Sequence, residues 1–104
     1  MIEIRSYIDW RGRRPFNQWL ERLDPPVRQR VTRILDRMTE GNLGDSHSVG
    51  EGIIERRIHF GPGYRIYFSW DGPTLIILLG GGDKSDQRDD IAKAKENRRD
   101  YQNR

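Results

Sequence analysis

The sequence predicts an α+β fold: a small, mainly antiparallel sheet with a pair of helices packed on one of its faces. Three observations predict it. Apolar residues recur at helical spacing between residues 15 and 40. Short apolar runs separated by glycine turns then occupy residues 53 to 79. A polar stretch with carboxylates at its start follows, as is typical of a surface helix. The predicted order is therefore β-α-α-β-β-β-α, in a single domain spanning residues 1–104.

The chain opens with a predicted strand. Ile2, Ile4 and Ile8 fall on one side of it, and Glu3 and Arg5 fall on the other. This strand is expected to join the sheet beside a later strand, but the sequence does not define its orientation.

Two helices are predicted to follow, joined by a short turn. Pro15 suits the first turn of the first helix, and Asp24-Pro25 ends that helix and begins the second. Gly41 is a suitable C-terminal cap for the second helix. The apolar stripe of the second helix consists of Val27, Val31, Ile34, Leu35 and Met38.

Residues 41–52 are rich in turn formers, and we expect them to form a connection. Strands are predicted over residues 53–60, 64–70 and 74–79. The run Leu75–Leu79 is apolar at every position, which predicts a strand that is covered on both faces or central in the sheet. Gly80-Gly81-Gly82 is expected to end it. The final helix, capped by Asp83 or Ser85, has a thin apolar face, and we expect it either to be loosely docked or to await a partner.

Composition limits the possible functions. Hydrophobic and charged residues each make up 34% of the chain, and the pI near 9.6 permits binding to nucleic acid. The absence of cysteine excludes disulfides and favours a cytoplasmic protein. His47 and His59 lie far apart in sequence without other ligand pairs, so we expect neither a metal nor a cofactor. No apolar run approaches the roughly 20 residues that a membrane helix needs.

The hairpin around Gly61-Pro62-Gly63 is the most informative segment. If Phe60 and Tyr64 flank the turn, Ile58 pairs with Ile66, His59 with Arg65, and Arg57 with Tyr67. One face of the hairpin is then apolar. The other collects four polar side chains, namely Arg57, His59, Arg65 and Tyr67. Two guanidiniums, an imidazole and a phenol on one sheet face suit a phosphodiester ligand.

These residue types match the tasks of a metal-free ribonuclease. Arginine stays charged and binds two phosphate oxygens, so it can neutralise a phosphorane-like transition state. Proton transfer usually falls to His, Glu, Lys or Tyr, and the candidates here are His59, Glu55 and Tyr67. Lys84 adds a cation at the sheet edge. The simpler interpretation is that these are solvated residues of an open sheet face, with Glu55 paired to Arg57.

From residue 41 onward the chain resembles a known family. The ordered motifs that carry the resemblance are Gly41-Asn42-Leu43-Gly44-Asp45, Val49-Gly50-Glu51-Gly52, Glu55-Arg56-Arg57, Gly61-Pro62-Gly63-Tyr64-Arg65 and Gly81-Gly82-Asp83-Lys84-Ser85. They are similar to those of addiction module killer proteins in the RelE/HigB-like superfamily of type II toxin–antitoxin toxins. The β-α-α beginning also fits, so the resemblance covers nearly the whole chain.

The resemblance implies an mRNA interferase, an endoribonuclease that cleaves mRNA at the ribosome and is silenced by a cognate antitoxin, here expected to be a HigA-like helix–turn–helix protein. A larger toxin–antitoxin complex on operator DNA is also implied. Arg65 resembles the superfamily's arginine that stabilises the transition state, and Arg57 and Lys84 resemble its other basic residues. The predicted catalytic residues are Arg57, Arg65, Lys84 and His59, and the predicted RNA contacts are Arg56, Tyr67 and Arg88.

One departure leaves the proton-transfer group open. Better-studied RelE-type members have a tyrosine beyond the last basic residue, where this chain has Gln87-Arg88-Asp89-Asp90. His59 or Glu55 substitutes for it by hypothesis. An alternative is therefore a catalytically weak binding module that serves as the antitoxin's partner and co-repressor. A free-standing DNA-binding protein is a third, weaker alternative, since the apolar residues of the helix pair are better explained by packing on the sheet.

Overall fold

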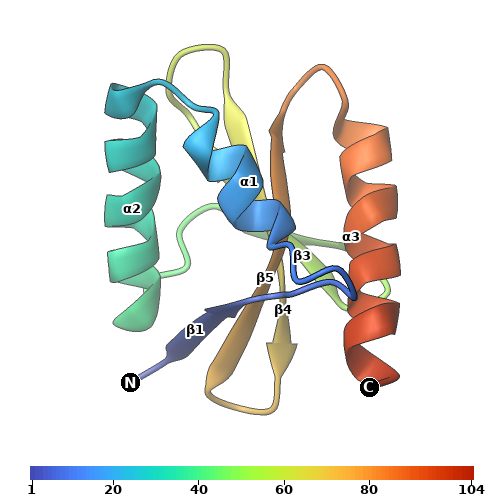
Figure 1. The fold of residues 1–104 in the computed structure, drawn as a ribbon. Helices are drawn as coiled ribbons and strands as arrows, with labels where there is room; N and C mark the ends of the chain where they lie inside the picture. The colour runs from blue at the N-terminus through green and yellow to red at the C-terminus, as the bar shows by residue number, and fades with distance from the viewer.

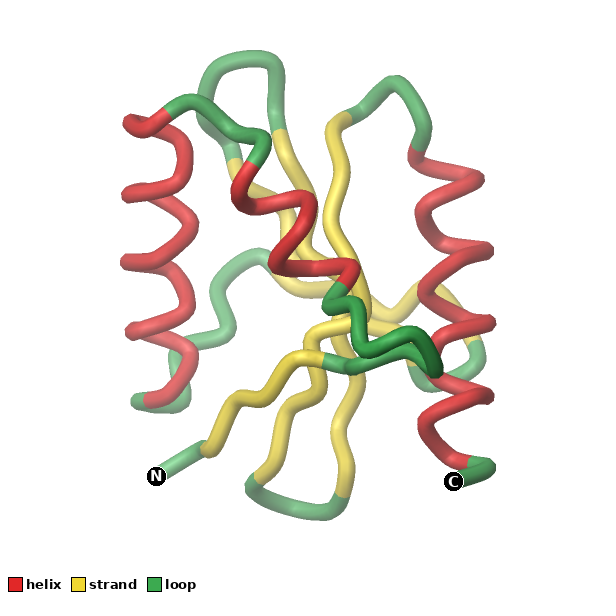
Figure 2. Tube along the Cα trace, viewed as in Figure 1, coloured by secondary structure: helices red, strands yellow, loops and turns green.

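A computed structural model describes all residues of the chain, 1–104, as a five-stranded sheet with helices on both faces (Figures 1 and 2). The elements in chain order are β1 (Glu3–Ser6), α1 (Pro15–Glu21), α2 (Pro25–Thr39), β2 (Ser46–Gly50), β3 (Ile53–Ile58), β4 (Tyr64–Asp71), β5 (Leu75–Asp83) and α3 (Gln87–Gln102). The predicted α+β class is confirmed, with one strand more than the sequence predicted.

The strands lie in the order β1-β5-β4-β3-β2. Four of them form antiparallel neighbours, and β1 alone is parallel, beside β5. The orientation of the first strand, which the sequence left open, is thus settled. The long connection from β1 through both helices and strands β2, β3 and β4 permits this parallel return.

The main core lies between the sheet and the helix pair. Val27, Val31, Ile34 and Met38 of α2 are buried, as their spacing predicts, and Phe16 of α1 joins them. The sheet contributes the apolar residues Ile58, Ile66, Phe68, Ile76 and Leu78. Figure 1 shows α2 and α3 on opposite sides of the sheet, with α1 crossing near the β1–β5 edge.

A second core lies under α3. It consists of Tyr7, Ile53, Tyr67, Ile77, Leu79 and Ala94. Because Ile76 and Leu78 face the helix pair while Ile77 and Leu79 face α3, β5 is covered on both faces as predicted. The expected loose docking of α3 is not observed, since the small Ala94 lets the helix approach and Asn97 donates to the Leu79 carbonyl at 2.9 Å.

Two boundaries differ from the prediction. Residues 46–50 form the edge strand β2, because a tight turn at Glu51 (φ 52°) and Gly52 (φ 77°) folds them back onto β3. Glutamate is unusual where the backbone is left-handed, so this hairpin was not predicted from the sequence. The glycines 80–82 continue β5 to Asp83, and Gly81 lies directly under the indole of Trp19.

Candidate functional site

The hairpin of β3 and β4 has a register that differs by two residues from the predicted one. Arg57 lies opposite Arg65, Glu55 opposite Tyr67 and Ile58 opposite Tyr64. The turn is longer than predicted because Phe60 leaves the strand and packs under the guanidinium of Arg30 from α2, at 4.4 Å. A shift of two residues keeps every side chain on its predicted face, so the apolar and polar faces of the hairpin survive the correction.

Two guanidiniums are held side by side by one buried carboxylate. Glu55 is fully buried, and its Oε1 accepts from Arg57 Nε at 3.1 Å and lies 3.4 Å from Arg65 Nε. Gln87, the first residue of α3, donates to the other carboxylate oxygen at 2.8 Å. The predicted pairing of Glu55 with Arg57 is therefore present, and Arg65 shares it. Because both arginines are engaged through Nε, their terminal nitrogens are not used by Glu55.

The guanidinium of Arg65 lacks a full set of partners. Its side chain is only 13% exposed, and both its Nε and its Nη1 are buried without a hydrogen-bond partner in the chain. Arg57 is more open, with 44% of its side chain exposed. A buried donor without an acceptor is costly, and an anion bound beside it would satisfy the donor.

A shallow cavity of about 420 Å³ opens beside these arginines. That volume lies within the roughly 300–1,000 Å³ typical of ligand pockets. Its lining consists of Arg57, Ile58, His59, Phe60, Gly61, Gly63, Tyr64, Arg65 and Lys84. The stem of Lys84 crosses Gly63, where a Cβ would lie 2.7 Å from Lys84 Cε; this glycine also has a φ of 90°. All four residues predicted to be catalytic therefore line one cavity.

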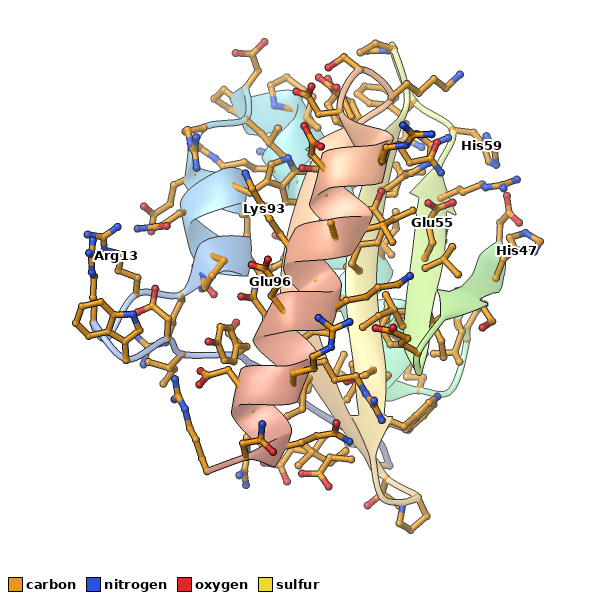
Figure 3. All side chains as sticks on the ribbon, turned by 90° about the vertical axis from the view of Figure 1, so that its right-hand side faces the viewer. Arg13, His47, Glu55, His59, Lys93 and Glu96 are labelled. Carbon is orange, nitrogen blue, oxygen red and sulfur yellow. The ribbon has the colours of Figure 1, made fainter.

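His59 is held by the carboxylate of Asp45, a motif residue to which the sequence assigned no role. Its Nε2 lies 2.6 Å from Asp45 Oδ2, and His47 Nε2 lies 2.5 Å from Asp45 Oδ1. These hydrogen bonds, first from His59 and then from His47, lower the pKa of the Asp45 carboxyl. Asp45 and His47 were missed because residues 41–52 were predicted to be a connection. Asp45 directly precedes strand β2, where its carbonyl accepts from the Arg57 amide, and His47 lies in β2 opposite Glu55; Figure 3 shows His47, Glu55 and His59 on this side of the sheet.

The three predicted RNA contacts lie outside this cavity. Tyr67 is fully buried beneath α3, where burial and then the charge of Glu55 raise the pKa of its phenol, so it presents no surface to a ligand. Arg56 points to the opposite sheet face, against Gly44, and desolvation lowers the pKa of its guanidinium. Arg88 is exposed on α3.

Two further structural findings bear on the kind of protein this is. No group of three or more His, Cys, Asp or Glu side chains is arranged to hold a metal ion. None of the three helices combines the length and the apolar character that crossing a bilayer requires.

The fold and the cationic cavity define a small α+β protein compatible with the RelE-like toxin fold. A family model described as "Phage derived protein Gp49-like (DUF891)" matches residues 18–99. The chain belongs to this family, which consists of phage-derived addiction-module killer proteins related to RelE toxins. An uncharacterized protein of Haemophilus influenzae is 43% identical over 81 residues, a match that covers 77% of this chain and 82% of the relative.

Membership in this family identifies the chain as a toxin-like addiction-module killer protein. Toxins of this kind act with an antitoxin partner in general. The family therefore supplies the class of protein, and the cavity supplies the residues from which a particular activity is proposed.

Proposed function

We propose that the chain is a metal-independent mRNA endoribonuclease that a cognate antitoxin neutralises. The observation that carries the proposal is the pair of guanidiniums, Arg57 and Arg65, anchored by the buried Glu55 beside a cavity that Lys84 and His59 also line. Three cations against one buried carboxylate leave a positive site. Phosphodiesters carry the complementary charge, and arginine binds their oxygens in a bidentate manner.

The reaction that suits this site is attack by a ribose 2′-oxygen on the adjacent phosphorus. The bond from phosphorus to the 5′-oxygen breaks, and a 2′,3′-cyclic phosphate remains. Negative charge accumulates on the non-bridging oxygens in between, and cations fixed in advance stabilise that charge without reorganising. Arg65, which pairs with Glu55 and is the least exposed of the three cations, is the candidate for this role, and the more exposed Arg57 and Lys84 bind the entering phosphate.

The reaction also moves two protons, one from the 2′-hydroxyl and one to the departing 5′-oxygen. Arginine remains protonated and cannot perform this exchange. Glu55 is buried, accepts from Arg57 and Gln87 and pairs ionically with Arg65, and Tyr67 is buried beneath α3. His59 lines the cavity with 73% of its side chain exposed, so it is our candidate for proton transfer.

The test is cleavage of a reporter mRNA in a purified translation system. Arg65→Ala is expected to lower the cleavage rate by about 10²–10³-fold, the usual loss when a fixed charge-stabilising donor is removed. Because Arg65 is largely buried, Arg57→Ala serves as a second variant that removes a more exposed guanidinium. Arg5→Ala, whose exposed side chain pairs with Glu3 away from the cavity, is the matched control.

If both Arg57→Ala and Arg65→Ala cleave as fast as the parent, the assignment of this cavity is wrong. Repeating the assay with naked mRNA tests the proposed action on translated mRNA, since a ribosome-dependent enzyme loses activity there. Adding a HigA-like helix–turn–helix protein from the neighbouring reading frame tests the proposed antitoxin. Binding of the two proteins together to their promoter tests the complex on operator DNA.

One observation favours a second candidate, a catalytically weak binding module. Glu55 engages Nε of both arginines, and the Arg65 side chain is almost enclosed, so a phosphate has limited access to it. This candidate predicts no cleavage at high protein concentration together with intact antitoxin binding. The same translation assay, run beside a binding measurement, separates the two.

A further inference from the structure

We propose that Asp45 is the positioning residue for His59, fixing its ring so that one nitrogen is available for proton transfer in the cavity. The inference deepens the proposed ribonuclease function and rests on it. It starts from a feature that the family resemblance did not include: the carboxylate of Asp45 is shared by two imidazoles, and one of these, His59, lines the cavity. Figure 3 labels both histidines.

Hydrogen bonds fix the backbone that carries the Asp45 carboxylate. The backbone carbonyl of Asp45 accepts from the Arg57 amide at 2.9 Å, which ties the residue to strand β3 beside the cavity. The preceding turn is closed by Ser46 Oγ, which donates to the Leu43 carbonyl at 2.6 Å. Gly44, with a φ of 61°, has a left-handed backbone that favours glycine and lies against the guanidinium of Arg56. The position of Asp45 therefore depends on backbone contacts that a change of its side chain would keep.

The hydrogen bond decides which ring nitrogen of His59 is available. An ionised carboxylate can only accept, so the nitrogen 2.6 Å from Asp45 Oδ2, Nε2, carries the proton of the neutral ring. The lone pair is then on Nδ1. Because His47 occupies Oδ1, the carboxylate cannot rotate freely without losing one of its two partners. The arrangement selects one tautomer and one ring orientation, as carboxylates do for imidazoles in other sites.

Stability alone does not explain this arrangement. The side chains of Asp45, His47 and His59 are 36%, 51% and 73% exposed, and exposed ion pairs contribute little to folding. Arg56 lies close enough to Asp45 to interact with it, but its guanidinium donates to the Arg57 carbonyl and not to the carboxylate. What the carboxylate changes is the geometry of an exposed imidazole that would otherwise sample many orientations.

The decisive experiment is a double-mutant cycle on mRNA cleavage. His59→Ala is expected to lower kcat by about 10²–10⁴-fold. Asp45→Ala is expected to lower kcat by about 10–100-fold with KM unchanged, the loss typical of outer groups that orient an imidazole. Because Asp45 acts through His59, the double variant should match His59→Ala within about twofold. Asp45→Asn keeps an oxygen acceptor and should lie closer to the parent than Asp45→Ala.

Two further measurements separate orientation from folding. Asp71→Ala removes another exposed carboxylate, one that accepts from Tyr101 at the opposite end of β4, and should leave kcat unchanged. Nitrogen-15 NMR of the His59 ring should show the Nε2–H tautomer in the parent and a mixture in Asp45→Ala. This readout does not depend on activity.

The outcomes are distinguishable. A parent chain that cleaves no RNA overturns the proposed function, and the role of Asp45 with it. If the parent cleaves and Asp45→Ala cleaves equally fast, only the role of Asp45 is overturned. Two results would show that Asp45 does not act through His59. One is a loss of kcat in the double variant equal to the product of the two single losses; the other is a His59 tautomer that is the same in Asp45→Ala as in the parent.

Discussion

Glu55→Gln is the substitution that tests most directly how the site is held together. It keeps the volume of the side chain and one oxygen acceptor but removes the charge. Glu55 is fully buried, and Arg65 beside it is only 13% exposed, so the guanidinium would lose its counter-ion where water cannot easily replace it. Breaking a buried pair from one side costs about 3–5 kcal/mol.

The exposure of the two arginines narrows the expected cost of Glu55→Gln. Arg57 is 44% exposed and can turn to water, so its share of the loss is that of a surface pair, at most about 1 kcal/mol. The cavity admits some water to Arg65, which favours the lower end for the buried pair. We therefore expect a loss of about 3 kcal/mol in the free energy of unfolding, out of the roughly 5–15 kcal/mol that a domain of this size has.

Urea denaturation measures this loss. A reduction of about 3 kcal/mol lowers the midpoint by about 1–3 M for typical slopes. Glu51→Gln is the matched control, since Glu51 is 51% exposed and pairs with Arg99 at 2.7 Å, so its loss should stay below about 1 kcal/mol. Combining Glu55→Gln with Arg65→Met should cost less than the sum of the two single changes. If Glu55→Gln costs no more than Glu51→Gln, the carboxylate does not anchor the arginines.

Two other predictions concern packing and charge around β5. Gly81→Ala should destabilise the protein by about 1–3 kcal/mol, because the new Cβ would lie 2.3 Å from Trp19 Cε3. Gly80→Ala, with no atom within 4 Å of the new Cβ, should change stability by no more than about 0.5 kcal/mol in the same denaturation assay. Asp90→Asn should stabilise the protein at neutral pH, because desolvation, followed by the charge of Asp86, raises the pKa of the Asp90 carboxyl in the folded state. A raised carboxyl pKa opposes folding above that pKa and has no effect below the unfolded value near 3.9, so the gain in melting temperature should vanish below about pH 4. Asp89→Asn, in the same helical turn but exposed, should show no such gain.

The sequence predicted the fold correctly wherever a periodic pattern of apolar residues could be buried in only one way. The stripe from Val27 to Met38 has one apolar side, so it could only pack against the sheet. The uninterrupted apolar run of β5 needed cover on both faces, which α3 completes. Strand β2 escaped prediction because its residues are polar and its turn places Glu51 in a left-handed conformation. Its pairing comes from the free edge of β3, which the sequence of β2 does not reveal.

For the site, alternation along the strands was enough to place Arg57 and Arg65 on one face, since that result is unchanged by any shift of two residues. The sequence also indicated that Lys84 adds a cation at the sheet edge, and the structure places it in the same cavity as the arginines. Only the tertiary structure decided which side chains are available there. Burial under α3 removed Tyr67 from the surface, and enclosure by two guanidiniums and Gln87 made Glu55 an anchor for the arginines. The pairing of β2 with β3 places Asp45 beside His59. A contact between residues 14 positions apart depends on how the chain folds back on itself, and the local sequence pattern does not reveal it.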